Sequence, residues 1–240
     1  MPNPFDPLVR FWLTITVFVL CLLYGAGALG AEPTAKLTTQ AKHILWTQLD
    51  TNKVSKSRHN EVLCLAENIY FEARAESYSG KAAVGNVTRN RVLDTRWPST
   101  YCEVVQQGPK RESWKTKQHK DLADKDRVYY PRKHRCQFSW YCDGQKDVIW
   151  ANYEKTGQTI KGNARAWKES VELAIMIAGN TKLTVSDNTD GAVYYYAHNL
   201  VYPSWAKTKS YIGVLGNHTF MKKKKLFEIS GPDRVYAIGL

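Results

Sequence analysis

Four glutamates between residues 61 and 77 are the first side chains of the sequence whose type and spacing suit chemistry. Glu72 and Glu76 are four residues apart, so in a helix they lie one turn apart on the same side. Such a carboxyl pair can bind a metal ion, act as a general acid, or form solvated ion pairs. Mutual repulsion and partial burial both raise the pKa of one carboxyl, and a general acid needs a raised pKa near neutral pH.

A helix over residues 59–76 has to position these glutamates. At about 100° per residue, Glu72 and Glu76 fall on one flank of an apolar stripe, whereas Glu67 points about 140° away from the start of the stripe. The stripe consists of Val62, Ala66, Ile69 and Ala73. We therefore expect Glu67 to be solvated, Glu61 to favour the helix macrodipole, and Glu72 and Glu76 to lie where buried and exposed faces meet.

The remaining pattern predicts an α+β fold, mainly helical with a small β region. Residues 80–94 read as a second helix with a small-residue face at Ala83 and Val87, and residues 163–178 as a third. Residues 103–107 are a strand or short helix and residues 136–144 a short strand. Residues 182–185, 192–198 and those after 210 are β-like or irregular. Asp143-Gly144 and Asp190-Gly191 mark turns.

The chain divides into three parts. Residues 11–31 hold no charge over 21 positions, and Ala28-Leu29-Gly30 resembles a cleavage site, so residues 1–31 are either a signal peptide or a membrane anchor. Residues 32–58 are polar and read as a linker or docking arm, and residues 59–240 as the folded domain. The chain is therefore expected to be exported to the periplasm or the cell exterior, or held in the inner membrane by residues 11–31.

Four cysteines remain in the expected exported part. They allow three pairings if all are used. Cys136 and Cys142 close a short loop, or one of them reaches Cys102, and these three are the disulfide candidates. The alternative for Cys64, which lies between leucines, is a buried thiol. The sequence shows no tight Cys/His spacing typical of metal binding, so we expect no metal site and no cofactor.

The net charge of +12 favours anionic partners. Basic residues gather at 108–135 and 222–225, and both runs also fit a solvated loop and turn. For an exported protein the anionic partners are wall polymers or a membrane surface, and nucleic acid is not expected.

Residues 68–92, NIYFEARAESYSGKAAVGNVTRNRV, resemble the signature of the SleB-type cell wall hydrolases, which include spore-cortex-lytic enzymes. The resemblance continues in order at YCEVVQQG (101–108), CQFSWYCDG (136–144), YYYAHNLVYPSWA (194–206) and IGVLGNHTFM (212–221). Two departures are Ala75, where the family has glycine, and the run from Tyr194 to His198, where many relatives have His-Tyr-His.

The resemblance implies a lysozyme- or lytic-transglycosylase-like catalytic domain that cleaves the peptidoglycan glycan strand, and it makes Glu72 the catalytic acid. Glu76 is then a second catalytic or tuning carboxyl, with Asp143 as another possible helper. An amidase that cuts between glycan and peptide, and a noncatalytic wall-binding or virion structural protein, are the alternatives. We expect peptidoglycan as partner and a monomer.

Aromatic and polar side chains complete the expected site. Aromatic rings stack on the apolar faces of sugars, and amide or hydroxyl groups hydrogen-bond N-acetyl groups. Trp205 is a further ring that could line the cleft, and Trp167 is assigned to the core. The expected substrate-binding residues are Tyr70, Asn90, Gln137, Ser139, Trp140, Tyr196 and His198.

Overall fold

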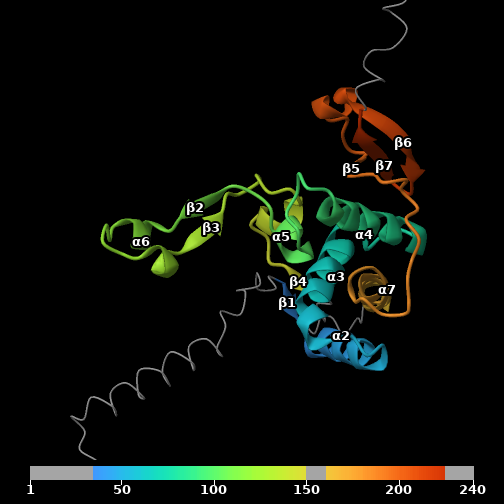
Figure 1. The fold of residues 1–240 in the computed structure, drawn as a ribbon, viewed down its shortest axis with the longest axis horizontal. Helices are drawn as coiled ribbons and strands as arrows, with labels where there is room; N and C mark the ends of the chain where they lie inside the picture. The colour runs from blue at the N-terminus through green and yellow to red at the C-terminus, as the bar shows by residue number, and fades with distance from the viewer. Residues whose placement is uncertain (1–34, 150–160, 225–240) are drawn as a thin grey trace, which may run out of the picture. The chain divides into compact units, whose positions relative to one another are not determined.

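The computed structural model of the protein describes residues 35–149 and 161–224 (Figure 1). Its helices are α2 (Thr39–Thr51), α3 (His59–Ala73), α4 (Tyr78–Leu93), α5 (Tyr101–Val105), α6 (Trp114–Lys117) and α7 (Lys161–Ala178). Short 3₁₀ turns are η1 (Lys56–Arg58), η2 (Asp124–Asp126), η3 (Ser139–Cys142) and η4 (Ser204–Thr208). The strands are β1 (Lys36–Leu37), β2 (Lys110–Glu112), β3 (Tyr129–Pro131), β4 (Val148–Ile149), β5 (Tyr194–Ala197), β6 (Lys209–Leu215) and β7 (His218–Lys223). This arrangement confirms the α+β prediction.

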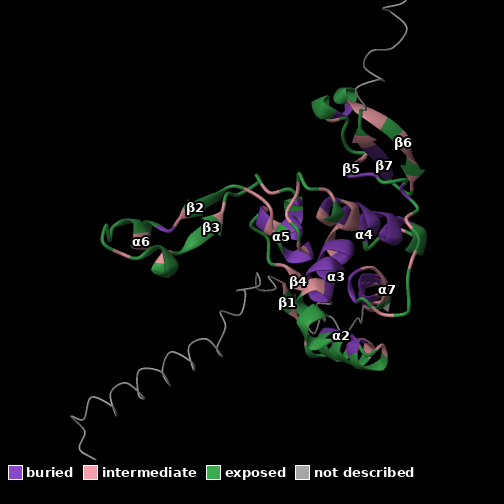
Figure 2. Ribbon diagram, in the orientation of Figure 1, coloured by how far each residue is buried: buried purple, intermediate pink, exposed green. Residues whose placement is uncertain are grey.

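Helix α3 lies at the centre of the helical body. It contacts α4, α5 and α7, and every residue from Val62 to Tyr70 is buried (Figure 2). The predicted apolar stripe is therefore confirmed, but the solvated Glu67 is not, because its side chain is 1% exposed. A residue far from the stripe faces water only when the helix lies on the surface, and α3 is covered on several sides.

Helix α4 packs closely against both α3 and α7. A Cβ atom at Gly85 would lie 2.7 Å from Ile177 Cδ1 and 3.0 Å from Ile69 Cδ1, so a larger residue would displace these side chains. Ala83 and Val87 are buried, as predicted, and pack in one cluster with Phe220 of β7. The small-residue face of α4 is thus the surface against which strands β5, β7 and β6, called the C-terminal sheet below, pack.

Residues 35–58 contribute directly to this body. Ala41, Leu45 and Leu49 of α2 are buried in the main core, and the Trp167 indole donates a hydrogen bond to the Ala41 carbonyl at 2.9 Å. This placement differs from the linker or docking arm expected for residues 32–58. The polar residues that favoured a linker lie on the outer side of an amphipathic helix.

The strands form three small sheets. Strand β1 pairs in parallel with β4, β2 pairs antiparallel with β3, and β5, β7 and β6 form an antiparallel sheet in that order. Residues 182–185 form no strand, and residues 139–142 of the expected middle strand are the turn η3. The predicted turns are present, with positive φ at Gly144, Asp190 and Gly191.

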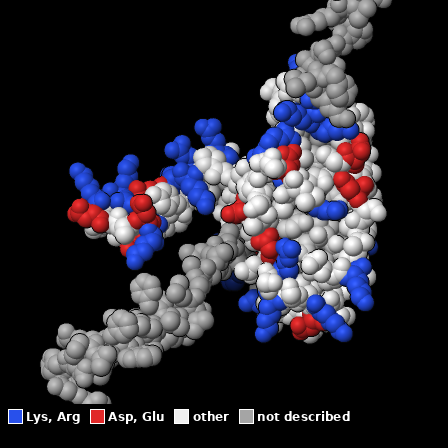
Figure 3. All heavy atoms as spheres, in the orientation of Figure 1, with Lys and Arg blue, Asp and Glu red and all other residues white. Residues whose placement is uncertain are grey.

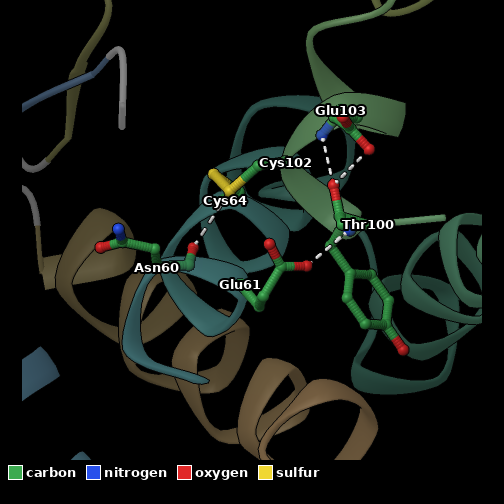
Figure 4. The surroundings of a disulfide bond; sticks show 7 residues. Asn60, Glu61, Cys64, Thr100, Cys102 and Glu103 are labelled. Carbon is green, nitrogen blue, oxygen red and sulfur yellow. Dashed lines mark hydrogen bonds between the residues drawn. A yellow bond between two sulfur atoms is a disulfide. The ribbon is translucent and has the colours of Figure 1, made fainter. Parts of the chain in front are cut away.

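Two disulfides lie in the described residues. Cys64 of α3 is bonded to Cys102 of α5 (Figure 4), which corrects the prediction of a free thiol at Cys64. Beside this bond, Glu61 accepts a hydrogen bond from the Tyr101 backbone N–H at 2.6 Å, so it satisfies the N-terminus of α5 as well as lying in the first turn of its own helix. The second disulfide joins Cys136 to Cys142, one of the pairings expected from the sequence.

Residues 1–31, including the expected leader, lie outside the described residues. Among the helices that the structure describes, none is long and apolar enough to cross a membrane.

Candidate active site

Glu72 lies in the last turn of α3 and faces the C-terminal sheet. The Tyr195 hydroxyl of β5 donates a hydrogen bond to Glu72 Oε2 at 2.9 Å. The pKa of Tyr195 is well above its ordinary value because the ring is enclosed and lies beside the Glu72 carboxyl. Tyr195 therefore stays protonated and remains a donor to Glu72.

Burial raises the pKa of Glu72 above its ordinary value, and the hydrogen bond from Tyr195 and the charge of Arg91 offset only part of that rise. The carboxyl is closely surrounded by protein atoms, yet Glu72 keeps some exposed surface. It is thus a carboxyl that holds its proton at higher pH than usual, in a residue that is not fully enclosed.

Arg91, in the last turn of α4, places a buried positive charge near this pair. Its Nε donates to the Val193 carbonyl at 2.9 Å, and its guanidinium lies 4.6 Å from the ring centre of Trp97 and 5.0 Å from that of Phe138. Its Nη1 is buried without a hydrogen-bond partner among the described residues. A cation held in this way stabilises Glu72 whenever the carboxyl loses its proton.

Glu76 is held differently from Glu72. Helix α3 ends at Ala73, so Glu76 lies in the turn before α4 and not one helical turn beyond Glu72. Glu76 Oε1 accepts a hydrogen bond from Asn217 Nδ2 at 2.8 Å, and the Asn217 backbone N–H lies 3.3 Å from Oε2. Glu76 thus connects the α3–α4 turn to the β6–β7 turn.

Two glycines make room for Glu76. A Cβ atom at Gly216 would lie 1.9 Å from Glu76 Oε2, and Gly216 also has a φ of +58°. A Cβ atom at Gly80 would lie 2.9 Å from Glu76 Cβ. The backbone on both sides therefore approaches this carboxylate more closely than any larger residue would allow.

His218 of β7 lies beside Glu76 and against the ring of Tyr195. Its Nδ1 is 3.8 Å from Glu76 Oε1 and has no hydrogen-bond partner in the described part of the chain. Its ring meets the Tyr195 ring edge-on, with centroids 5.1 Å apart. Burial lowers the pKa of His218 despite the nearby Glu76 carboxylate, and His198 lowers it further, so the ring is neutral at pH 7.

Several expected substrate-binding residues belong to the interior. Tyr70 is 1% exposed and packs edge-on against Phe71 and Trp167, so Trp167 is a core residue as predicted. Trp140 is 6% exposed, stacks on Phe71, and donates its indole N–H to Asn68 Oδ1 at 3.0 Å. Neither ring offers a free face to a sugar.

The expected polar residues are scattered. The Asn90 amide nitrogen donates to Asp187 Oδ2 at 2.9 Å and to the Ala192 carbonyl at 3.1 Å, so it ties α4 to the segment before β5. Gln137 and Ser139 are exposed around η3. Asp143 accepts a hydrogen bond from the Gln145 backbone N–H at 2.7 Å, and no contact between Asp143 and Glu72 is present in the described residues.

Tyr196 points to the face of the sheet opposite Tyr195, because successive side chains of a strand alternate. It lies there in an aromatic cluster with Tyr202 and Trp205, with ring centroids 5.9 Å from each. His198 is exposed just beyond the strand. These expected residues are accessible, but they are not brought to Glu72.

Three residues that surround the glutamates did not emerge from the sequence: Tyr195, Arg91 and His218. The alternation of side chains along residues 194–197 predicts that Tyr195 lies on the opposite face of the strand from Tyr194 and Tyr196. It does not predict which of these faces packs against the helices. Arg91 and His218 lie within the family-like motifs, yet only the fold shows that they are buried beside carboxyl groups. Among the described residues, no cluster of three or more His, Cys, Asp or Glu is arranged to hold a metal ion.

A family model described as cell wall hydrolase matches residues 75–221, more than half of the chain. The chain belongs to the cell wall hydrolase family. The match confirms the resemblance to SleB-type hydrolases seen in the sequence and identifies the protein as an enzyme of this family. Arg91, Tyr195 and Glu76 lie within the matched residues of this cell wall hydrolase, whereas Glu72 lies three positions before them.

Two solved structures are similar to this cell wall hydrolase. The catalytic domain of the germination-specific lytic transglycosylase SleB from Bacillus anthracis is 22% identical, over 68% of this chain and 93% of that one, with a TM-score of 0.39. The catalytic domain of the Bacillus cereus SleB protein is 21% identical, over 68% and 89%, with a TM-score of 0.37. No curated protein matches the chain.

Proposed function

We propose that this cell wall hydrolase cleaves the glycan strand of peptidoglycan, with Glu72 as general acid and then general base. One observation carries the proposal: the Glu72 carboxyl has a raised pKa, a hydrogen bond from Tyr195 and a nearby buried Arg91. Protonation of a glycosidic oxygen requires a carboxyl whose pKa is raised above its ordinary value.

In the first step Glu72 donates its proton to the glycosidic oxygen while the bond from that oxygen to the anomeric carbon breaks. Tyr195 occupies Oε2, so the proton is delivered from Oε1, and Arg91 stabilises the carboxylate that remains. In the second step the carboxylate accepts a proton from the attacking hydroxyl as that oxygen bonds to the anomeric carbon. Glu72 is then protonated again and the cycle closes.

The attacking hydroxyl decides between two outcomes. When the 6-hydroxyl of the same sugar attacks, the product is an anhydro sugar and one carboxyl suffices. When water attacks, hydrolysis normally uses a second carboxyl. Glu76, whose oxygens are hydrogen-bonded to Asn217, is not free to activate water, so we favour lytic transglycosylation. Glu76 serves in this proposal to position the β6–β7 turn.

Digestion of purified peptidoglycan followed by mass spectrometry tests the proposal. We expect anhydro-muropeptides from the wild-type protein and none from Glu72→Gln. Reducing muramic ends would instead indicate a hydrolase, and free stem peptides an amidase. No product from a folded wild-type protein would leave a wall-binding protein and overturn the enzymatic proposal.

The same proposal places the enzyme outside the cytoplasm, in the periplasm or at the cell exterior. The two disulfides support this, because disulfides persist in oxidising compartments. Cell fractionation and gel mobility of the exported protein test the location and the fate of the leader; a fully cytoplasmic protein with reduced cysteines would contradict it.

A further inference from the structure

Residues 109–135, called the basic arm below, carry charge out of proportion to their length, together with three exposed aromatic side chains. Ten Lys and Arg stand against four Asp and Glu, so this segment provides +6 of the net charge of +12. Figure 3 shows basic side chains along the arm with acidic ones among them. Trp114 is 66% exposed, and Tyr129 and Tyr130 are about half exposed at 50% and 53%. A loop that is only solvated needs no such aromatic side chains, and exposed aromatic groups are typical of binding surfaces.

The basic arm is an ordered hairpin rather than an irregular loop. Strands β2 and β3 lie side by side, with Arg111 opposite Tyr130 (Figure 1). At its base, the Gln137 backbone N–H donates to the Gln107 carbonyl at 2.8 Å, and the Cys136–Cys142 disulfide closes the turn that follows. A Cβ atom at Gly108 would lie 3.0 Å from Cys136 Cα, so the two chain segments meet closely there.

A groove of about 570 Å³ runs along the hairpin and onto α6. This volume lies within the range of about 300–1,000 Å³ that is usual for ligand clefts. Two aromatic rings, Trp114 and Tyr130, line the groove together with four basic side chains. These basic residues are Lys110, Arg111, Lys117 and Arg132.

The positive charge of the groove is not neutralised within the arm. Glu112, the acidic residue of its lining, is paired with Arg127 at 2.7 Å. Of the arm's ten basic residues, Arg127 alone forms ion pairs with acidic residues in the described part of the chain. The four basic side chains of the groove therefore remain available for an anionic ligand.

We propose that the groove of the basic arm binds peptidoglycan at a site separate from Glu72. Aromatic rings and cations together fit a polymer that carries sugar rings and carboxylates side by side, as a glycan strand with peptide stems does. Trp114 and Tyr130 pack against pyranose faces, and the basic side chains pair with carboxylates of the stems. The inference rests on the proposed function only in taking peptidoglycan as the substrate.

The distribution of acidic residues argues against a bilayer as the occupant. Asp121, Asp124 and Asp126 lie in the loop that joins α6 to β3, and all three are exposed. A flat anionic membrane would meet a hairpin at this end, where Lys120, Lys125 and Arg127 only balance the three carboxylates and leave no net positive charge to attract it. A polymer strand instead lies across the groove, away from these residues.

The packing at the base connects the arm to the catalytic region. Phe138 and Trp140 follow the arm in sequence and lie in one apolar cluster, against which both Phe71 and Tyr195 pack. The arm and the Tyr195–Glu72 pair are thus attached to the same cluster. A polymer held by the arm stays tethered while Glu72 cleaves it.

Sedimentation with washed peptidoglycan sacculi tests the proposal. The full chain carries Glu72→Gln in every sample, so that the sacculi are not degraded. Adding Arg111→Glu and Lys117→Glu is expected to weaken binding roughly tenfold at low salt, because attraction becomes repulsion. Trp114→Ala alone is expected to weaken it severalfold with little change in salt dependence, since it removes stacking rather than charge.

Lys42→Glu with Lys182→Glu is the matched control, because it changes the net charge equally on exposed lysines of the helical body. It should bind sacculi nearly as the parent does. Equal binding by the arm variant and the parent would overturn the proposal. It would also be overturned by arm-dependent binding to phosphatidylglycerol vesicles, to DNA or to a second copy of the chain with unchanged binding to sacculi.

Measurements of glycan cleavage distinguish failure of the arm site from failure of the proposed function. With Glu72 intact, the arm variant should digest sacculi more slowly but cleave a short soluble glycan fragment at the wild-type rate. If the wild-type protein releases no glycan product and the arm variant still loses sacculus binding, the proposed function fails and the arm site stands. If glycan is cleaved and the arm variant binds sacculi normally, the arm site alone fails.

Discussion

The end of α3 and the turn that follows it each present one glutamate to the C-terminal sheet, and the two are held in opposite ways. Glu76 accepts hydrogen bonds from the backbone and side chain of Asn217, and its side chain is 7% exposed. Among the described residues, Glu72 accepts one, from Tyr195, and its pKa is raised by burial. The donors around Glu76 suit a structural role, whereas the buried Glu72 carboxyl with one donor suits the general-acid role proposed for it.

This contrast separates effects on activity from effects on stability. Changes at Glu72 are expected to act mainly on catalysis, and changes around Glu76 mainly on the free energy of unfolding. Glu72 and Glu76 are four residues apart in sequence. Activity and unfolding measurements on matched variants of the two residues therefore test whether their roles differ.

The largest effect is expected from Glu72→Gln, which removes the transferable proton but keeps the shape and an acceptor for Tyr195. Activity on peptidoglycan should fall by roughly 10²- to 10⁴-fold, the usual contribution of a general acid. Release of soluble muropeptides measures it. Glu76→Gln, the matched control, should keep most of the activity; equal losses in both variants would remove the distinction.

Gly216→Ala should give the largest loss of stability. The new Cβ would lie 1.9 Å from Glu76 Oε2, at a residue with a φ of +58°, so either the Glu76 carboxylate leaves its hydrogen bonds to Asn217 or the β6–β7 turn shifts. We expect a loss of about 2–4 kcal/mol in the free energy of unfolding, measured by denaturant titration.

Gly191→Ala is the control for backbone strain alone. Gly191 has a φ of +74°, but a Cβ atom at this position would meet nothing within 4 Å beyond its chain neighbours. This variant should lose about 1 kcal/mol. Similar losses at both glycines would show that close approach to Glu76 contributes nothing.

Glu76→Ala tests the same junction from the other side. It removes the acceptor of the Asn217 backbone N–H and Nδ2 and is expected to cost about 1–2 kcal/mol, because Asn217 is exposed and water replaces part of the bonding. Thermal or urea unfolding measures it. An unchanged stability together with a total loss of activity would instead make Glu76 catalytic.

The sequence predicts the elements but not their neighbours. The stripe that includes Val62 and Ile69 and the small face at Ala83 follow from local periodicity, which the fold preserves. A helical wheel places Glu67 in water because it says nothing about how many elements cover the helix. The apolar neighbours of Cys64 favour a buried thiol. Its disulfide partner, Cys102, lies in α5, and local sequence does not reveal that the fold brings α5 against α3.

The candidate site shows the same limit. The family-like motif singles out Glu72, but the sequence favours Tyr196 over Tyr195 for the site, since a strand's alternation does not reveal which face packs on the helices. Tyr70 and Trp140 are expected to bind sugars because aromatic type alone does not distinguish a core ring from an exposed one. These assignments need tertiary contacts.

Tyr195→Phe should have a moderate effect with a distinct signature. The hydrogen bond from Tyr195 lowers the pKa of Glu72, so its loss raises that pKa further. The acid step needs the protonated form, and the alkaline limb of the pH–rate profile should therefore move to higher pH while the maximal rate falls roughly tenfold. Tyr196→Phe, on the opposite face of the sheet, should change neither; an alkaline limb that stays in place in Tyr195→Phe would argue against the Tyr195–Glu72 contact in solution.

The smallest effect is a gain in stability at Glu72, the proposed catalytic residue. The folded-state pKa of Glu72 is raised above its ordinary value of 4.5, so the folded state is destabilised as pH rises from about 4.5 through the folded-state pKa. Glu72→Gln removes this ionisation and should raise the melting temperature at pH 7, with the difference from wild type disappearing near pH 4. Glu76→Gln should not show this gain, because it weakens bonds to Asn217 at every pH. A Glu72→Gln protein less stable than wild type at pH 7 would mean that the carboxylate is favoured by its surroundings, and Glu72 would then resemble Glu76 in its role.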